Sequence, residues 1–193
     1  MESKFYEKKL GILGGGQLGK MLITECNKMD LSVSVLDPSN GSPCKNICEK
    51  FERGDFKDYD TVVKFGEKCD IITFEIEHVN VDALEFLEKN GKEVYPKSKT
   101  LKIIQDKNKQ KSFFLRNSIP TANFKFFSNI SEFRSSINQN KINFPCIWKK
   151  TKLGYDGFGV KILKSVDDID SLPETEMIIE DLIPFEKELS VIV

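Results

Sequence analysis

Long apolar runs are absent from this sequence of 193 residues. No stretch approaches the roughly 18 consecutive apolar residues of a membrane-spanning helix, so we expect no membrane partner. The opening residues MESKFYEKK lack both the apolar segment of a secretory signal and the Arg/Ser-rich, acid-poor composition of a transit peptide. These absences predict a cytoplasmic protein.

Histidine and paired cysteines are also scarce. The chain has one histidine, His78, and five scattered cysteines with neither a CxxC pair nor zinc-finger spacing. An odd, scattered set of cysteines suits a reducing compartment better than a disulfide framework. Cys44, Cys48 and His78 match no metal-binding spacing, so we predict no metal ligands in this chain.

An excess of charge of either sign is missing as well. The net charge is −1, which argues against a general attraction to nucleic acid. Six neighbouring lysines are the local exception, but no aromatic residues alternate with them to stack bases, so a solvated helix face is the more ordinary interpretation. These six are Lys97, Lys99, Lys102, Lys107, Lys109 and Lys111. We therefore predict no nucleic-acid partner.

The sequence does contain enough apolar residues, 39% against 31% charged, for one large core or two modest ones. Near the start, residues 9–13 form an apolar run, GGGQLG follows, and residues 17–29 alternate as an amphipathic helix. Residues 31–36 then predict a second strand, closed by Asp37 and Pro38. The pattern predicts a βαβ unit with a right-handed crossover.

Gly14, Gly16 and Gly19 fit the GxGxxG pattern, and Asp37 ends the second strand where a ribose-binding acid lies in dinucleotide folds. A dinucleotide-binding oxidoreductase is therefore one interpretation. The same helix N-terminus suits any phosphate, including a ribose 5-phosphate, so the pattern alone leaves the anion open.

A third strand, residues 70–75, ends at Glu75. In open α/β sheets ligands bind at that end, so Glu75 is a candidate to hydrogen-bond a substrate hydroxyl or amine, and a simple surface acid is the alternative. Asn80 predicts the N-cap of a further helix, and residues 93–95 predict a fourth strand before Pro96.

After Pro96 the pattern changes. Two helical segments lead to a domain boundary that we place near Lys109. The order beyond it is strand 124–127, helix 132–138, strand 145–149 and strand 159–163, which predicts an antiparallel α+β unit. Residues 177–179 predict another strand. Residues 188–193 predict one more that stops without a cap or turn, which suggests a fragment.

Residues 147–160, IWKKTKLGYDGFGV, connect two of these strands through a glycine-rich loop. Gly154, Gly157 and Gly159 would let backbone N–H groups approach an anion beside Lys149. No helix follows, so the loop is a hairpin tip and not the GxxxxGK[ST] phosphate loop. The pattern is compatible with a flexible phosphate cover or with an ordinary glycine-rich hairpin.

Four motifs in one order add a more specific signal: GGGQLGKM, TFEIEHVN, IIQDKNKQK and GYDGFG. Over residues 8–193 they resemble the ATP-grasp enzymes, and among these the 5-(carboxyamino)imidazole ribonucleotide synthetase family. EIEHV, QDK and KELSVIV are most similar to the fungal and plant form, in which this unit is fused to a mutase domain. The resemblance implies an α/β chain: a Rossmann-like pre-ATP-grasp domain over residues 1–109, then the incomplete α+β N-terminal part of an ATP-grasp domain over residues 110–193.

The resemblance also implies site residues. Lys107 and Lys149 would contact ATP phosphates, Glu180 would belong to the hinge at the adenine edge, and Glu188 would bind the ribose. The implied ATP-binding set is Lys107, Lys149, Gly154, Tyr155, Asp156, Gly157, Phe158, Gly159, Val160, Glu180, Asp181, Leu182, Ile183 and Glu188. The implied set for 5-aminoimidazole ribonucleotide is Gly15, Gly16, Gln17, Leu18, Glu75, Tyr155 and Asp156. Lys149 and Asp156 would be catalytic.

The implied reaction joins ATP, bicarbonate and 5-aminoimidazole ribonucleotide in purine synthesis, with Mg²⁺ as a cofactor whose ligands we expect beyond this chain. A homodimer is the family precedent. Two features depart from the family pattern. Phe158 stands where the family usually has arginine, and the sequence is short, because the family's magnesium-binding acids and the rest of its ATP sheet lie beyond residue 193. Lys107 stands where bacterial members usually have arginine. A different ATP-grasp ligase and a truncated, inactive binding domain remain alternatives.

Overall fold

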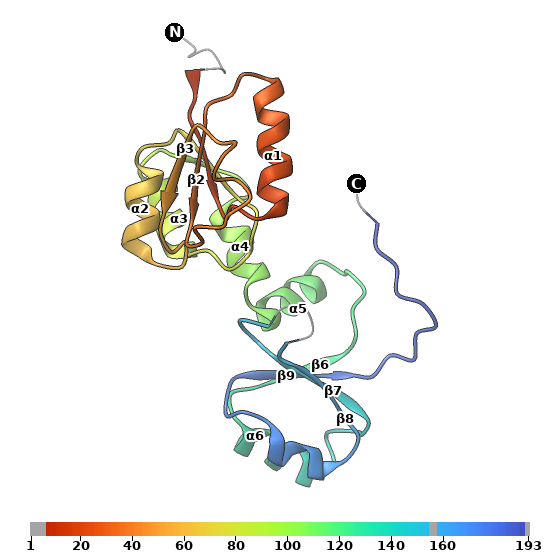
Figure 1. Ribbon diagram of the computed structural model, residues 1–193. Coiled ribbons are helices and arrows are strands. Elements are labelled where there is room, and N and C mark those ends of the chain that lie inside the picture. Colours follow the sequence, from red (N-terminus) through yellow and green to blue (C-terminus); the bar gives the residue numbers. More distant parts are fainter. Residues whose placement is uncertain (1–6, 155–157, 192–193) are drawn as a thin grey trace. The chain divides into compact units, whose positions relative to one another are not determined.

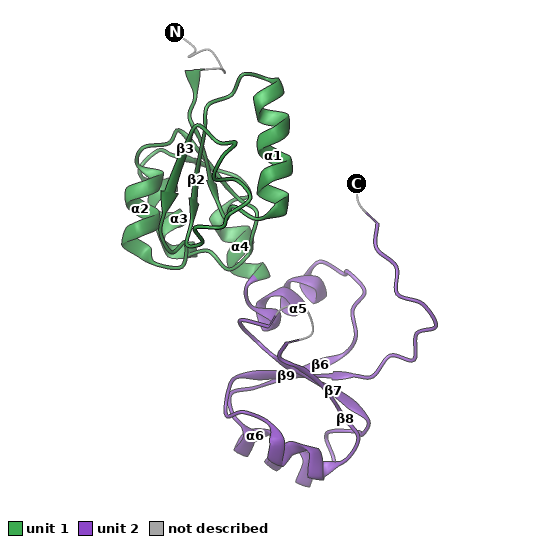
Figure 2. Ribbon diagram, viewed as in Figure 1, with its two compact units in different colours: residues 1–104 green, residues 105–193 purple. Residues whose placement is uncertain are grey.

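The computed structural model describes residues 7–154 and 158–191. The chain divides into two compact units, residues 1–104 and residues 105–193 (Figures 1 and 2). Each unit has a sheet and a core of its own, and we describe each by itself. The expected domain limit near Lys109 lies inside the first helix of the second unit.

The first unit alternates strands and helices around a parallel sheet of five strands in the order β3-β2-β1-β4-β5. This order is that of a doubly wound fold without its sixth strand, and it reverses beside β1. Its elements are β1 (Leu10–Leu13), α1 (Gln17–Lys28), β2 (Val33–Asp37), β3 (Lys50–Arg53), α2 (Tyr59–Gly66), β4 (Ile71–Phe74), α3 (Val81–Lys89), β5 (Glu93–Val94) and α4 (Ser98–Ile104).

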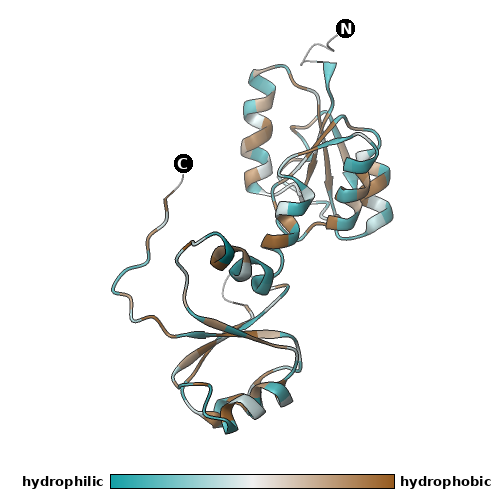
Figure 3. Ribbon diagram, turned by 180° about the vertical axis from the view of Figure 1, so that it is seen from behind, coloured by the Kyte–Doolittle hydropathy of each residue, from teal (hydrophilic) through white to brown (hydrophobic). Residues whose placement is uncertain are grey.

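The two faces of this sheet carry separate cores. Ile12, Val33 and Val35 pack with Ile23 of α1 on one face. Leu13, Leu36 and Ile72 pack with side chains of α2, α3 and α4 on the other, and the sheet is therefore the middle of three layers. In Figure 3 the brown, apolar ribbon concentrates on the strands, while the helices alternate brown and teal, as amphipathic helices do.

The register of β1 with its neighbours brings three carboxyl ends together. Leu13 lies opposite Leu36 of β2 and opposite Phe74 of β4. The next residues along the three strands are therefore Gly14, Asp37 and Glu75. The fold places the glycine turn between two carboxylates that are distant in sequence. Asp37 lies 22 residues from Gly15, to which it bonds, and Glu75 lies 59 residues from Gly16.

Side-chain caps fix several helix starts. Asp58, Asn80, Asp106 and Asn129 each accept a backbone N–H from the first turn of α2, α3, α5 and α6, respectively. Our sequence analysis did not assign β3 or α2. The strand β3 lies at an edge and has no fully buried residue, so its apolar signal is weak.

The second unit is built on an antiparallel sheet of four strands in the order β6-β9-β7-β8. The expected α+β arrangement is confirmed, including the hairpin from β7 to β8. The elements are α5 (Lys107–Arg116), β6 (Phe124–Phe127), α6 (Ile130–Asn138), β7 (Cys146–Lys150), β8 (Val160–Leu163), the 3₁₀ helix η2 (Val166–Ser171) and β9 (Met177–Asp181).

Alternation along β7 and β9 gives this sheet two different faces. Trp148 and Ile179 belong to a core that they share with Phe133 of α6 and Ile169 of η2. Side chains of a strand alternate between faces, so Lys149 and Glu180 lie on the opposite face, toward α5. One face of the sheet thus builds the core, and the other carries charge.

The strand expected over residues 188–193 is wrong for the residues that the structure describes. Residues 188–191 form no strand, and Leu189 and Val191 are exposed. An apolar alternating segment becomes a strand only when a neighbouring strand bonds to its backbone. In the described part of the chain, no strand pairs with residues 188–191. Within the same described residues, no helix is both long enough and apolar enough to cross a membrane.

Candidate functional site

The glycine turn of the first unit is held by its own carboxylates. Asp37 Oδ2 accepts the Gly15 N–H at 2.7 Å, and Glu75 Oε1 accepts the Gly16 N–H at 3.0 Å. Asp37 Oδ1 also accepts the Ser39 N–H at 2.7 Å, and Asp37 is only 9% exposed. Both oxygens of Asp37 thus bind backbone, which leaves a poor acceptor for a ribose and weighs against the dinucleotide interpretation.

Close packing explains why glycines occupy this turn. A Cβ on Gly15 would lie 2.3 Å from Ser42 Oγ, and one on Gly16 would lie 2.7 Å from Glu75 Oε1. Gly14 has a φ of +93°, a conformation that side chains disfavour. The turn is a tightly packed structural element.

The start of α1 remains open to a ligand. Gly16 is the N-cap and supplies no side-chain hydrogen bond. The N–H groups of Gln17 and Leu18, in the first turn of the helix, therefore have no acceptor within the helix. Leu18 is 62% exposed. Of the five residues predicted in this unit, Gly15, Gly16 and Glu75 bond to one another or to Asp37, and Gln17 and Leu18 begin the helix.

In the second unit, three lysines share one cavity of about 370 Å³, which we call the lysine cavity. The start of α5 is tied to the end of β7, because the Lys107 N–H donates to the Thr151 carbonyl at 2.8 Å. Lys107 and Lys111 are four residues apart on α5, so their side chains lie on the same helix face, toward the sheet. Lining residues include Lys107, Lys111, Thr121, Lys149, Val160 and Glu180.

Glu180 is the counter-ion of this cavity. It is 5% exposed, its Oε2 lies 2.7 Å from Lys149 Nζ, and its Oε1 lies 3.3 Å from Lys111 Nζ. Glu180 pairs with Ile147 across β9 and β7, so Lys149 is its diagonal neighbour on the same face. With Lys107 added, three cationic groups face one carboxylate, and the wall favours an anion.

The glycine-rich loop borders the same cavity. Lys107 Nζ donates to the Gly154 carbonyl at 3.4 Å, and the Lys150 N–H donates to the Gly159 carbonyl at 2.8 Å. Gly159 has a φ of +74°, and Phe158 is 68% exposed. The predicted site residues Tyr155, Asp156 and Gly157 lie outside the described residues.

The remaining predicted ATP residues follow Glu180. Asp181 ends β9 and accepts a hydrogen bond from Asn123 at 2.9 Å. Leu182 and Ile183 continue the chain without regular structure, and Glu188 is exposed beyond them. The structure brings Lys107, Lys149, Val160 and Glu180 to one cavity and leaves Glu188 in an exposed segment.

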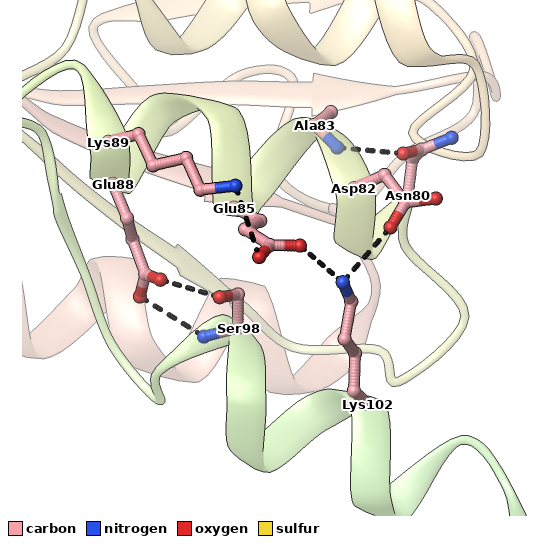
Figure 4. Close-up of polar contacts among 8 residues, drawn as sticks. All are labelled: Asn80, Asp82, Ala83, Glu85, Glu88, Lys89, Ser98 and Lys102. Atoms are coloured by element: carbon pink, nitrogen blue, oxygen red, sulfur yellow. Dashed lines mark hydrogen bonds and ion pairs between the residues drawn. The ribbon is translucent and has the colours of Figure 1, made fainter.

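The lysine group of the sequence is divided between two roles. In the first unit, Lys102 pairs with Asp82 and Glu85 of α3, and beside it Glu88 binds the backbone and hydroxyl of Ser98 (Figure 4). In the second unit, Lys111 is buried at 7% exposure, so the expected solvated face is wrong at this residue. Its spacing of four from Lys107 was the available signal.

Magnesium finds no evident place in the described part of the chain. No group of three or more His, Cys, Asp or Glu residues lies close enough there to hold a metal ion. The carboxylate that lines the lysine cavity, Glu180, already pairs with two lysines. The described residues therefore do not fit a metal site.

Comparisons with known proteins agree with this arrangement. A family model described as "Ribonucleotide synthetase preATP-grasp domain" matches residues 7–105, and an ATP-grasp domain model matches residues 112–193. The phosphoribosylaminoimidazole carboxylase of Vigna aconitifolia is 36% identical over 194 residues, which cover 97% of this chain and 34% of that protein.

Solved structures give the same picture. The N5-carboxyaminoimidazole ribonucleotide synthetase of Thermotoga maritima is 34% identical with a TM-score of 0.82, and the match covers 93% of this chain and 47% of that one. The Aspergillus clavatus enzyme, solved with ADP and 5-aminoimidazole ribonucleotide, is 30% identical with a TM-score of 0.80 over 93% and 47%. The chain thus spans between a third and a half of these proteins. It belongs to the ribonucleotide synthetase pre-ATP-grasp family, with the N-terminal part of an ATP-grasp domain as its second unit.

Proposed function

We propose that this chain contributes to the ATP-dependent carboxylation of 5-aminoimidazole ribonucleotide by bicarbonate, in purine synthesis. The observation that carries the proposal is the lysine cavity, in which Lys107 and Lys149 lie beside a glycine loop in the unit matched by the ATP-grasp model. Lysine binds phosphate as a point charge, and a glycine loop lets backbone N–H groups approach it. The Aspergillus clavatus relative, solved with ADP and 5-aminoimidazole ribonucleotide, supports both ligands.

The proposed chemistry is phosphoryl transfer followed by carboxylation. A bicarbonate oxygen attacks the γ-phosphorus of ATP, the bond to ADP breaks, and carboxyphosphate forms. The substrate amine then attacks the carboxyl carbon, phosphate leaves, and the amine loses a proton. Lys107 and Lys149 would stabilise the transferring charge, while the loop would exclude water from the labile intermediate. Mg²⁺ would neutralise further phosphate charge, and we assign its ligands to no described residue of this chain.

In the first unit, the N–H groups at the start of α1, near Gln17 and Leu18, would bind the 5-phosphate of the substrate. Gly15 and Gly16 would shape this turn, and Glu75 would orient the substrate while it holds Gly16. In the loop, Tyr155 would contact the substrate and Asp156 would orient or deprotonate its amine. An Asp156→Asn variant with full turnover and an unchanged pH profile would remove the role of Asp156.

ATP binding by the 193-residue chain tests the nucleotide half of the proposal. Replacing either Lys107 or Lys149 by methionine should weaken ATP binding about 10- to 100-fold, because a charged hydrogen bond is lost. Lys164, an exposed lysine of the same unit, provides the control variant Lys164→Met. Equal affinities in all four proteins, measured by calorimetry, would contradict the proposal.

Substrate-dependent ADP release tests the reaction itself, in the protein extended to the length of its relatives. We expect release to require both bicarbonate and 5-aminoimidazole ribonucleotide. Release with a different acid or amine would favour another ATP-grasp ligase, and tight NADH binding would favour the oxidoreductase.

Location and assembly are further parts of the proposal. We infer a cytoplasmic protein from the odd number and scattered positions of the cysteines, which suit a reducing compartment, although the Vigna aconitifolia relative is named as chloroplastic. A homodimer and a fused or separate mutase partner follow from the family resemblance. Cell fractionation and light scattering after gel filtration check location and dimer formation, respectively.

A further inference from the structure

Lys111 is a buried ammonium that the proposed chemistry does not use. Its side chain is 9% exposed, donates to Thr121 Oγ1 at 2.6 Å, and lies 5.4 Å from the centre of the Phe124 ring. A buried lysine needs partners to stay charged, and here a carboxylate, a hydroxyl and an aromatic face supply them. Lys111 is therefore fixed in one place.

Lys149 contrasts with it. Its side chain is 27% exposed, and it reaches Glu180 through a single hydrogen bond of 2.7 Å. The two lysines bind different oxygens of the same carboxylate, Lys149 at Oε2 and Lys111 at Oε1. One partner of Glu180 is thus fixed and the other can move into the lysine cavity.

A ligand phosphate would compete with Glu180 for Lys149. If Glu180 had no second cation, the departure of Lys149 would leave a carboxylate of 5% exposure without a counter-ion, which is strongly unfavourable. With Lys111 at 3.3 Å, the carboxylate stays neutralised after Lys149 leaves. Lys111 therefore lowers the free-energy cost of moving the Lys149 ammonium from Glu180 to a ligand phosphate.

We infer that Lys111 is a positioning residue that holds Glu180 when Lys149 moves from Glu180 to a nucleotide phosphate. The inference deepens the proposed function and rests on it. It assigns to Lys111 no contact with ATP, because Lys111 acts through Glu180. Removing Lys111 should consequently reduce the contribution of the phosphates to affinity and leave recognition of the nucleoside unchanged.

The experiment compares the affinities of the 193-residue chain for ATP and for adenosine, by calorimetry. In Lys111→Met the ratio of the two affinities should fall at least about tenfold, while adenosine binding stays within about twofold of the parent. The matched control is Lys109→Met, which removes a charge from an exposed position of the same helix and should change the ratio by less than about twofold. Lys111→Arg should retain the parent ratio, because it keeps the charge.

A double variant separates positioning from direct contact. In Lys111→Met/Glu180→Gln, no carboxylate remains to hold Lys149, so the ratio should recover to within about threefold of the parent. A ratio as low as in Lys111→Met alone would overturn the inference, because Lys111 would then act on the phosphates directly. Thermal melting of each variant identifies those that fail to fold.

The ¹⁵Nζ signal of Lys149 gives a readout that a purely structural role would not move. ATP should shift this signal in the parent and in Lys109→Met, but not in Lys111→Met. An unchanged ratio in Lys111→Met, or equal losses of ATP and adenosine binding, would overturn the inference. A parent chain that binds ATP no better than adenosine would instead overturn the proposed nucleotide function and, with it, the role of Lys111.

Discussion

The two units treat their acidic side chains in opposite ways. In the first unit, Asp37 and Glu75 accept backbone N–H groups and fix a turn. In the second unit, Glu180 accepts no described backbone group through its side chain and instead pairs with two lysines beside a cavity. The comparison shows that a carboxylate near the end of a strand can bind backbone N–H groups or neutralise neighbouring lysines, and only its partners distinguish the two.

The largest expected effect is on the second unit. Glu180→Ala would leave the buried ammonium of Lys111 without its carboxylate, which should lower the free energy of unfolding of that unit by about 3 to 5 kcal/mol. Glu176→Ala, at an exposed acid just before β9, should change it by less than about 0.5 kcal/mol. Urea denaturation measures both. Equal stability of the two variants would show that Glu180 is not a buried counter-ion.

The corresponding change in the first unit is Asp37→Ala. It removes the acceptor of two backbone N–H groups, so the free energy of unfolding of the first unit should fall by about 2 to 4 kcal/mol. Asp60→Ala, at an exposed acid in α2, is the control. ATP binding by the second unit should not change in Asp37→Ala. If Asp37→Ala lost ATP affinity without losing stability, Asp37 would serve ligand binding and not the fold, contrary to the contrast between the two units.

A smaller effect is expected at the turn glycine. Gly15→Ala places a Cβ 2.3 Å from Ser42 Oγ, and relief of that overlap should cost about 1 to 3 kcal/mol of stability. In the matched variant Gly41→Ala, the nearest atom to the new Cβ is Ser39 Oγ at 3.7 Å, so stability should be preserved. Thermal melting distinguishes the two. If both melted with the parent, the turn would be less tightly packed than its contacts indicate.

The smallest effect concerns pH and should be shared by both units. Burial raises the pKa of the Cys69 thiol in the first unit and of the Cys146 thiol in the second from 9.0 to about 11. Each folded unit keeps a proton that the unfolded chain releases, so this stability is full below pH 9 and is lost as pH rises toward 11. The loss should be about 1 kcal/mol per thiol near pH 10.

Alanine variants measure the contribution of each thiol to the pH dependence of stability. The stability difference between the parent and Cys69→Ala, or between the parent and Cys146→Ala, should shift in favour of the variant as the pH rises from 8 to 10. A difference that stays constant with pH would exclude a raised thiol pKa at that position.

Sequence patterns predicted much of this fold because its signals are local. Glycines at 14, 16 and 19, the Asn80 cap and the alternation in residues 146–150 and 160–163 each act within a few residues. The bonds of Asp37 to Gly15 and of Lys111 to Glu180 depend on chain crossings that local patterns do not encode. The strand expected after Glu188 failed because its pairing partner, too, is a non-local requirement.

The burial of Trp148 has a practical spectroscopic consequence. It is the single tryptophan of the chain, and it lies 4% exposed in the core of the second unit. Its emission should therefore shift to longer wavelength when that core opens, while unfolding of the first unit leaves the indole in place. Tryptophan fluorescence thus follows one unit and circular dichroism follows both, so one titration can order the two unfolding events in unlabelled protein.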